Sequence, residues 1–91
     1  MRMIKAKEGF IIQRMMESYM IIAIGEESES FRSIIQTNET GAFYWRMIEE
    51  GTTLEKLIQA SLNRFDDLDE PTARHDIAEF LESIAPAVTI Q

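Results

Sequence analysis

The sequence contains no cysteine and only one histidine, His75. Without cysteine there is no disulfide, no thiolate nucleophile, no iron–sulfur cluster and no cysteine-ligated zinc. The sequence also lacks any run approaching the ~18 apolar residues of a membrane span, and its first ten residues contain no apolar core of a signal peptide. We therefore expect a cytoplasmic protein with no membrane partner, no metal and no other cofactor.

Basic residues are also scarce. The chain has 9 Lys and Arg against 16 Asp and Glu, which gives a formal net charge of −7. This charge repels phosphate backbones, so we expect no nucleic-acid partner. At 91 residues the chain is shorter than an average domain. We expect a single domain spanning residues 1–91, with a small core and little room for a deep catalytic cavity.

The first half of the chain favours strands. Residues 10–24 are rich in β-branched and aromatic residues with one polar interruption, which predicts two strands joined by a tight turn. We expect three methionines of this hairpin to pack in the core or on a sheet face: Met15, Met16 and Met20. A polar stretch, residues 25–30, predicts a solvated loop. Residues 33–37 predict a brief third strand, which carries neither charge nor proline to protect an open edge.

The second half favours helices. Asn38 is a candidate cap for a helix that ends near Glu50, and the apolar face of that helix includes Trp45, which we interpret as a core anchor. The pair Thr52 and Glu55 has the spacing of a capping box and predicts the start of a second helix.

A third helix is bounded by the two prolines of the chain. Pro71 suits a first helical turn, and Pro86 disfavours the helical conformation of the residue before it. The tail after Pro86 either adds an edge strand or hangs free. Three strands followed by three helices predict an α+β domain whose small sheet has exposed edges. Adding a peptide strand to such an edge is a known binding mode.

The residues with reactive side chains show no catalytic pattern. His75 is predicted to lie opposite the apolar face of the third helix, so we interpret it as a surface residue. An acidic group precedes that helix and is more typical of capping and solubility than of a metal site: Asp66, Asp67, Asp69 and Glu70. Arg74, in the first turn of the helix, is a candidate for contact with a partner. The sequence therefore predicts no enzyme active site.

The octet NETGAFYW, residues 38–45, resembles the Asn-Glu-Thr-Gly-x-x-(aliphatic)-Trp signature of the PqqD family, small proteins named for pyrroloquinoline quinone biosynthesis. The resemblance extends from about Lys7 to Ile84. Two positions depart from the family pattern, because Thr37 stands where leucine is usual and Tyr44 where an aliphatic residue is usual.

This resemblance implies a winged-helix-like domain with a three-stranded antiparallel sheet followed by three helices. It also implies a peptide chaperone that binds the leader of a ribosomally made precursor peptide as an added strand. The chaperone then presents the leader to a modifying enzyme, often a radical S-adenosylmethionine (SAM) enzyme. Carried over by position, the peptide-binding residues are Ser33, Ile34, Ile35, Gln36, Arg74, Ile77, Ala78 and Leu81. The acidic charge further favours a basic leader.

Two other classes of function stay open. The first is a structural module in which the open edge pairs with a second copy to form a homodimer. The second is a winged-helix DNA-binding protein, which would need a basic recognition helix. In residues 53–63 of this sequence, Lys56 is balanced by Glu55.

Overall fold

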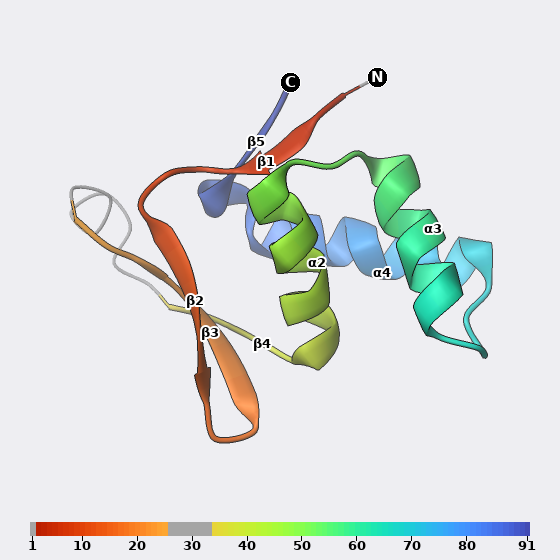
Figure 1. Ribbon diagram of the computed structural model, residues 1–91, viewed down its shortest axis with the longest axis horizontal. Helices are drawn as coiled ribbons and strands as arrows, with labels where there is room; N and C mark the ends of the chain where they lie inside the picture. Colours follow the sequence, from red (N-terminus) through yellow and green to blue (C-terminus); the bar gives the residue numbers. More distant parts are fainter. Residues whose placement is uncertain (1, 26–33) are drawn as a thin grey trace.

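The computed structural model describes residues 2–25 and 34–91 and has an α+β fold, as the sequence predicts. A three-stranded antiparallel sheet is followed by three helices, with the sheet on one side of the molecule and the helices on the other (Figure 1). In chain order the elements are β1 Ile4–Ala6, β2 Phe10–Met15, β3 Ser18–Ala23, β4 Ile35–Thr37, α2 Glu39–Glu50, α3 Leu54–Arg64, α4 Glu70–Ser83, a 3-10 turn Ala85–Ala87 and β5 Val88–Ile90.

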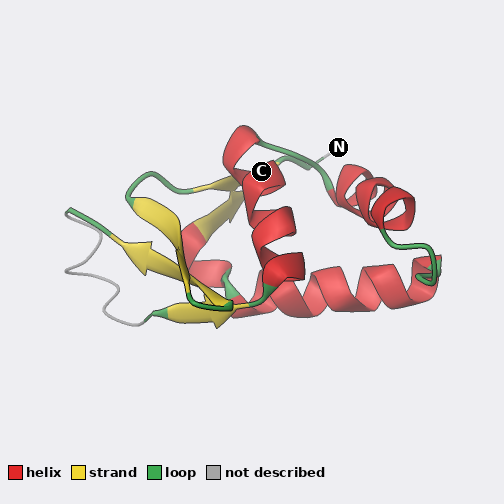
Figure 2. Cartoon of the chain, turned by 60° about the horizontal axis from the view of Figure 1, so that its bottom comes forward, coloured by secondary structure: helices red, strands yellow, loops and turns green. Residues whose placement is uncertain are grey.

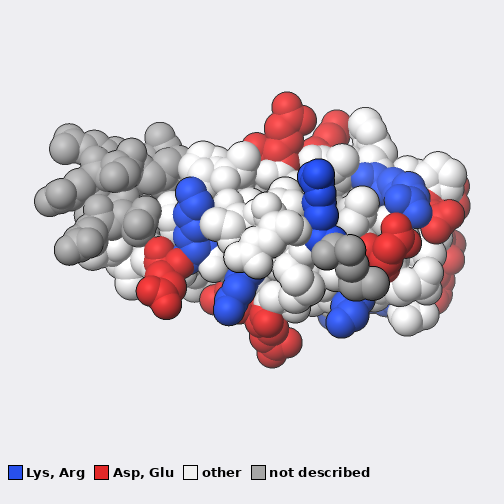
Figure 3. All heavy atoms as spheres, turned by 90° about the horizontal axis from the view of Figure 1, so that it is seen from above, with Lys and Arg blue, Asp and Glu red and all other residues white. Residues whose placement is uncertain are grey.

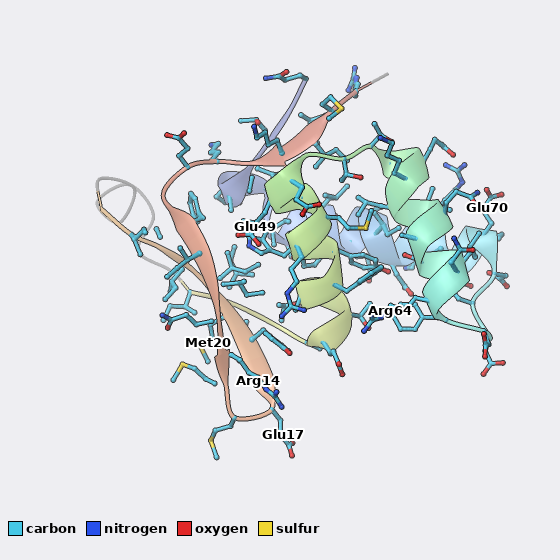
Figure 4. The ribbon with its side chains drawn as sticks, in the orientation of Figure 1. Arg14, Glu17, Met20, Glu49, Arg64 and Glu70 are labelled. Atoms are coloured by element: carbon cyan, nitrogen blue, oxygen red, sulfur yellow. The ribbon has the colours of Figure 1, made fainter. Side chains whose placement is uncertain are left out.

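The main sheet has the order β2-β3-β4, so β2 and β4 are its two edges. Its inner face is set by Ile21, which is fully buried and pairs with Ile12 on β2 and Ile35 on β4. Side chains alternate along a strand, so Met20 lies on the opposite, outer face (Figure 4). The third strand is predicted at residues 33–37 and observed at Ile35–Thr37, with Ser33 outside the described residues.

The prediction of a packed methionine is wrong for Met16 and inaccurate for Met15. Met16 is 92% exposed because it occupies the turn of the hairpin, where its backbone is left-handed with φ of 59°. Met15 is 53% exposed at the end of β2, on the outer sheet face, which no described helix covers. The sequence showed the strands and the turn but not which face of the hairpin would meet the helices.

The tail forms a strand, and its partner is the N-terminal segment. β5 pairs antiparallel with β1 to make a separate two-stranded sheet, in which Ile4 is opposite Ile90 (Figure 1). Ile4 is also bridged to Thr52 by two backbone hydrogen bonds of 2.7 and 2.9 Å. β1 was not expected, because three residues are too few to show an alternating pattern.

The helix caps follow the sequence with one shift. Asn38 caps α2 by accepting a hydrogen bond from the Gly41 amide at 2.9 Å, and Gly51 ends that helix with φ of 90°. The predicted capping box at Thr52 is wrong by one residue. Thr53 caps α3 and accepts from the Lys56 amide at 3.2 Å, while Thr52 is held in its bridge to β1.

The core lies between the main sheet and the helices. It contains Trp45, which is fully buried on α2 as expected. Around it pack residues from every helix and from the inner sheet face, among them Ile21, Ile48, Leu57, Ile58, Ile77 and Ile84. Within the described ranges, no helix is long and apolar enough to cross a membrane.

Candidate functional site

A groove lies beside the C-terminal end of β4. Because β4 pairs with β3 on one side only, its other edge faces away from the sheet, and the end of the strand lies near α4 (Figure 2). A cavity of about 470 Å³ occupies this region. It is lined by the end of β4, the first turns of α2 and one flank of α4: Thr37, Asn38, Thr40, Gly41, Tyr44, Asp76, Glu79, Phe80 and Ser83.

The groove continues into a second cavity of about 420 Å³. The two cavities share Thr40, Tyr44 and Asp76, so they form one depression that runs from β4 to the connector between α3 and α4. The remaining wall of the second cavity is formed by that connector: Phe65, Asp66, Asp67 and Leu68.

The NETG segment supplies the walls of this groove rather than reactive groups. Asn38 fixes the start of α2, and Gly41 is buried three residues later. A Cβ at Gly41 would collide with the Thr37 Oγ1 atom and would lie 3.0 Å from Phe80 Cε1. The missing side chain therefore allows β4, α2 and α4 to meet at a single point.

The predicted strand residues lie along the edge of the sheet. Ile34 is 58% exposed, Ile35 is half-buried against the core, and the Gln36 amide nitrogen donates a 3.1 Å hydrogen bond to Ser18 Oγ on the outer face. Ser33 lies outside the described residues. Three of the four predicted strand positions are thus on or beside β4, at the side of the sheet where the groove begins.

The predicted residues of α4 do not line the groove. Ile77 is fully buried in the core, Ala78 is exposed, and Leu81 is half-buried. Arg74 points toward α3 and its own first turn, with its guanidinium 3.4 Å from Glu55 and 3.6 Å from Glu70. Both contacts are solvent-exposed, and such pairs contribute only about 0–1 kcal/mol.

The flank of α4 that does line the groove was not selected by the sequence. Asp76, Glu79, Phe80 and Ser83 recur at i, i+3, i+4 and i+7 and so share one side of the helix. Phe80 is the residue from which the sequence could have indicated this flank, because it is an aromatic residue at the margin of the apolar face. Its ring lies 5.5 Å from the Tyr44 ring, between α2 and α4.

The groove is acidic. Its lining includes four carboxylates and neither Lys nor Arg: Asp66, Asp67, Asp76 and Glu79. Glu79 lies 3.1 Å from His75, which is exposed on the surface of α4 as predicted. Asp69 is outside the groove and caps α4. Hydrogen bonding from Thr72, first from its side chain and then from its amide, lowers the pKa of the Asp69 carboxyl below the usual 3.8. No group of described His, Asp and Glu residues is arranged to hold a metal ion.

The fold and the groove together are those of a small α+β domain with an exposed sheet edge. Such a scaffold can accept an added strand. The family model described as Coenzyme PQQ synthesis protein D (PqqD) matches residues 22–86, and the chain belongs to this family.

A solved structure described as "TbiB1 in Complex with the TbiA(beta) Leader Peptide" has the same fold. It superposes with a TM-score of 0.70 at 18% sequence identity, and the match covers 89% of this chain and 87% of that one. No curated protein matches the chain.

Proposed function

We propose that this protein binds the leader segment of a ribosomally made precursor peptide by strand addition to β4 and presents it to a modifying enzyme, for which a radical SAM enzyme is the expected type. The protein itself performs no catalysis in this proposal and acts in the cytoplasm. The observation that carries the proposal is the edge of β4 that pairs with no other described strand, beside a groove walled by α2 and α4. Membership of the PqqD family and the shared fold of a leader-peptide complex support it.

Strand addition explains how one short edge can serve a peptide partner. Each added backbone hydrogen bond contributes about 0.5–1.5 kcal/mol and depends little on sequence. A strand of three residues offers few such bonds. The groove beside it must therefore supply the selectivity through side-chain contacts.

The test is a titration of the isotope-labelled protein with the leader of a precursor encoded beside its gene. Amide shifts are expected at Ser33, Ile34, Ile35 and Gln36. A series of leader peptides with one N-methylated residue each should lose affinity at every second position, because only alternate amides of an added strand face β4. Shifts confined to the β2–β3 hairpin, or a loss without this period, would contradict strand addition to β4.

A matched pair of variants identifies the flank of α4 that meets the peptide. Ser83→Trp places a large side chain in the groove, whereas Ala78→Trp places the same side chain on the flank that contains Arg74 and Leu81. Both positions are exposed, so neither change disturbs the core. We expect only Ser83→Trp to block the leader. The reverse result would assign binding to Arg74, Ile77, Ala78 and Leu81, as the family resemblance implies.

Pairing between copies is the second candidate, and the position of β2 as the other edge strand of the sheet, counted among the described strands, favours it. Light scattering across a concentration series distinguishes the two, because a dimer through β4 would compete with the leader, whereas a dimer through β2 would not. A nucleic-acid partner has less support. On the face shown in Figure 3, the basic side chains of the described residues are separated by acidic and uncharged ones.

A further inference from the structure

The part of the groove farthest from β4 is lined by aromatic, apolar and acidic side chains of α2, α4 and the α3–α4 connector. The lining of the cavity beside the α3–α4 connector combines large apolar and aromatic side chains with acidic ones: Tyr44, Phe65 and Leu68, and Asp66, Asp67 and Asp76. It shares three lining residues with the cavity at β4, which is itself lined by Thr37 at the end of that strand, so the two cavities adjoin.

Tyr44 is the buried polar side chain among the residues that line this cavity. Its side chain is only 2% exposed and lines both cavities, yet its hydroxyl makes no hydrogen bond with any other described residue. The ring is fixed between Phe43 and Phe80, at centroid distances of 5.7 and 5.5 Å. A hydroxyl both donates and accepts, so the Tyr44 hydroxyl is available to pair with a polar group of an occupant of the cavity.

The charge of the cavity determines the kind of occupant. None of its three aspartates forms an ion pair within the described residues, and no Lys or Arg is among the lining residues. Arg64, the last residue of α3, lies with its guanidinium carbon 4.7 Å from the centre of the Phe43 ring and 5.8 Å from the centre of the Phe65 ring (Figure 4). The aspartates are therefore free to accept hydrogen bonds from a cation supplied by the ligand.

We propose that this cavity is a subsite for one lysine or arginine side chain of the bound peptide, at a position just beyond the segment that pairs with β4 on its Thr37 side. The proposal rests on the strand-addition function. The aliphatic stem of the side chain packs on Phe65 and Leu68, the cationic head is bound by Asp66, Asp67 and Asp76, and the Tyr44 hydroxyl pairs with the head or with the adjacent peptide backbone.

The first experiment selects binders from a display library of random 12-residue peptides. Wild-type protein should enrich peptides with Lys or Arg at one fixed distance from an apolar strand-forming segment. A variant carrying Asp66→Asn and Asp67→Asn should still enrich the strand-forming segment but lose the basic residue. The matched control carries Glu49→Gln and Glu50→Gln, which remove two charges from the exposed end of α2 outside both cavities, and it should keep the basic preference (Figure 4).

The second experiment measures affinity with a pair of selected peptides that differ only by arginine or citrulline, its neutral isostere, at the fixed position. Citrulline should bind wild type about five- to tenfold more weakly, between the effects typical of exposed and buried charged hydrogen bonds. In the Asp66→Asn, Asp67→Asn variant, which keeps Asp76, the difference in affinity between the arginine and citrulline peptides should fall to less than about twofold. Tyr44→Phe should weaken the arginine peptide about threefold without lowering thermal stability, since the hydroxyl has no partner in the free protein.

The outcomes separate this proposal from the function on which it rests. Peptides that shift the β4 amides but show no basic preference, or a citrulline effect that persists in the aspartate variant, overturn the subsite and leave strand addition intact. If no selected peptide shifts the β4 amides, strand addition is wrong and the subsite falls with it.

Discussion

Replacing Gly41 by alanine tests the packing that forms the groove. In a helix interior, alanine is favoured over glycine by about 0.8–1.0 kcal/mol, so propensity alone predicts that Gly41→Ala stabilises the protein. The structure predicts the opposite. The new Cβ would collide with Thr37 Oγ1 and lie 3.0 Å from both Thr37 Cβ and Phe80 Cε1.

The net effect follows from the two opposing contributions. Inserting a methyl group into a packed site costs about 1–3 kcal/mol, and this site is at the upper end because Thr37 Cβ is fixed by its strand and Phe80 packs against Tyr44. After subtraction of the helix-propensity gain, we expect a loss of about 1–2 kcal/mol in the free energy of unfolding. In a chain of this size, each kcal/mol lost from the free energy of unfolding lowers Tm by about 4–8 °C.

The assay is urea unfolding followed by the fluorescence of Trp45, the only tryptophan of the chain and a fully buried one. Thr37→Ala in the Gly41→Ala background removes the colliding oxygen and should restore part of the loss, which gives a coupling between the two sites. Leader affinity should fall in Gly41→Ala, because β4 must move away from α4. A Gly41→Ala protein as stable as wild type, with no coupling to Thr37, would refute the close approach.

Three further predictions concern stability. Asn38→Ala should lower the free energy of unfolding by about 1 kcal/mol. Asn38→Ser should lower it much less, because serine also accepts a hydrogen bond at the cap. Ile77→Ala, which truncates a buried side chain, should lower the free energy of unfolding by about 2–5 kcal/mol. Ala78→Ser, a change at the exposed neighbouring position, should lower it by less than about 0.5 kcal/mol. The lowered pKa of Asp69 stabilises the fold above the unfolded value of 3.8, and this contribution is lost as pH falls through the folded pKa. Unfolding measured from neutral to acidic pH should show that Asp69→Asn lacks this part of the acid sensitivity.

Much of the fold was predictable because its signals are local. The cap at Asn38 and the stop at Gly51 each depend on a few neighbouring residues, and each is observed where it was expected. The turn of the first hairpin lies at Met16 and Glu17, one residue before the predicted interruption at Glu17 and Ser18. The β1–β5 sheet was not predictable in the same way. Its strands are three residues long and are separated by almost the whole chain, so their pairing depends on where the helices place the two ends.

The same distinction explains the shifted cap. Thr52 and Thr53 both have a hydroxyl of suitable chemistry, and local spacing to Glu55 favoured Thr52. Its backbone is instead held by Ile4, which is 48 positions away in the sequence and pairs with Thr52 in both directions. Thr53 is then the first residue free to cap α3. A long-range contact thus decided between two choices that are locally equivalent.

The flank of α4 that lines the groove depends on tertiary packing of this kind. At about 100° per residue, Phe80 and Leu81 border the buried stripe of Ile77 on opposite sides, so periodicity alone treats the two flanks as equal. Gly41 distinguishes the two flanks, because the Thr37 side chain of β4 fills the space of its missing Cβ and the Phe80 ring of α4 packs beside it. Arg74, on the other flank, is then directed to Glu55 on α3. The glycine of the NETG segment therefore decides which side chains of α4 line the groove beside β4. Among them are Asp76 and Glu79, two of the carboxylates on which the proposed preference for a basic peptide rests.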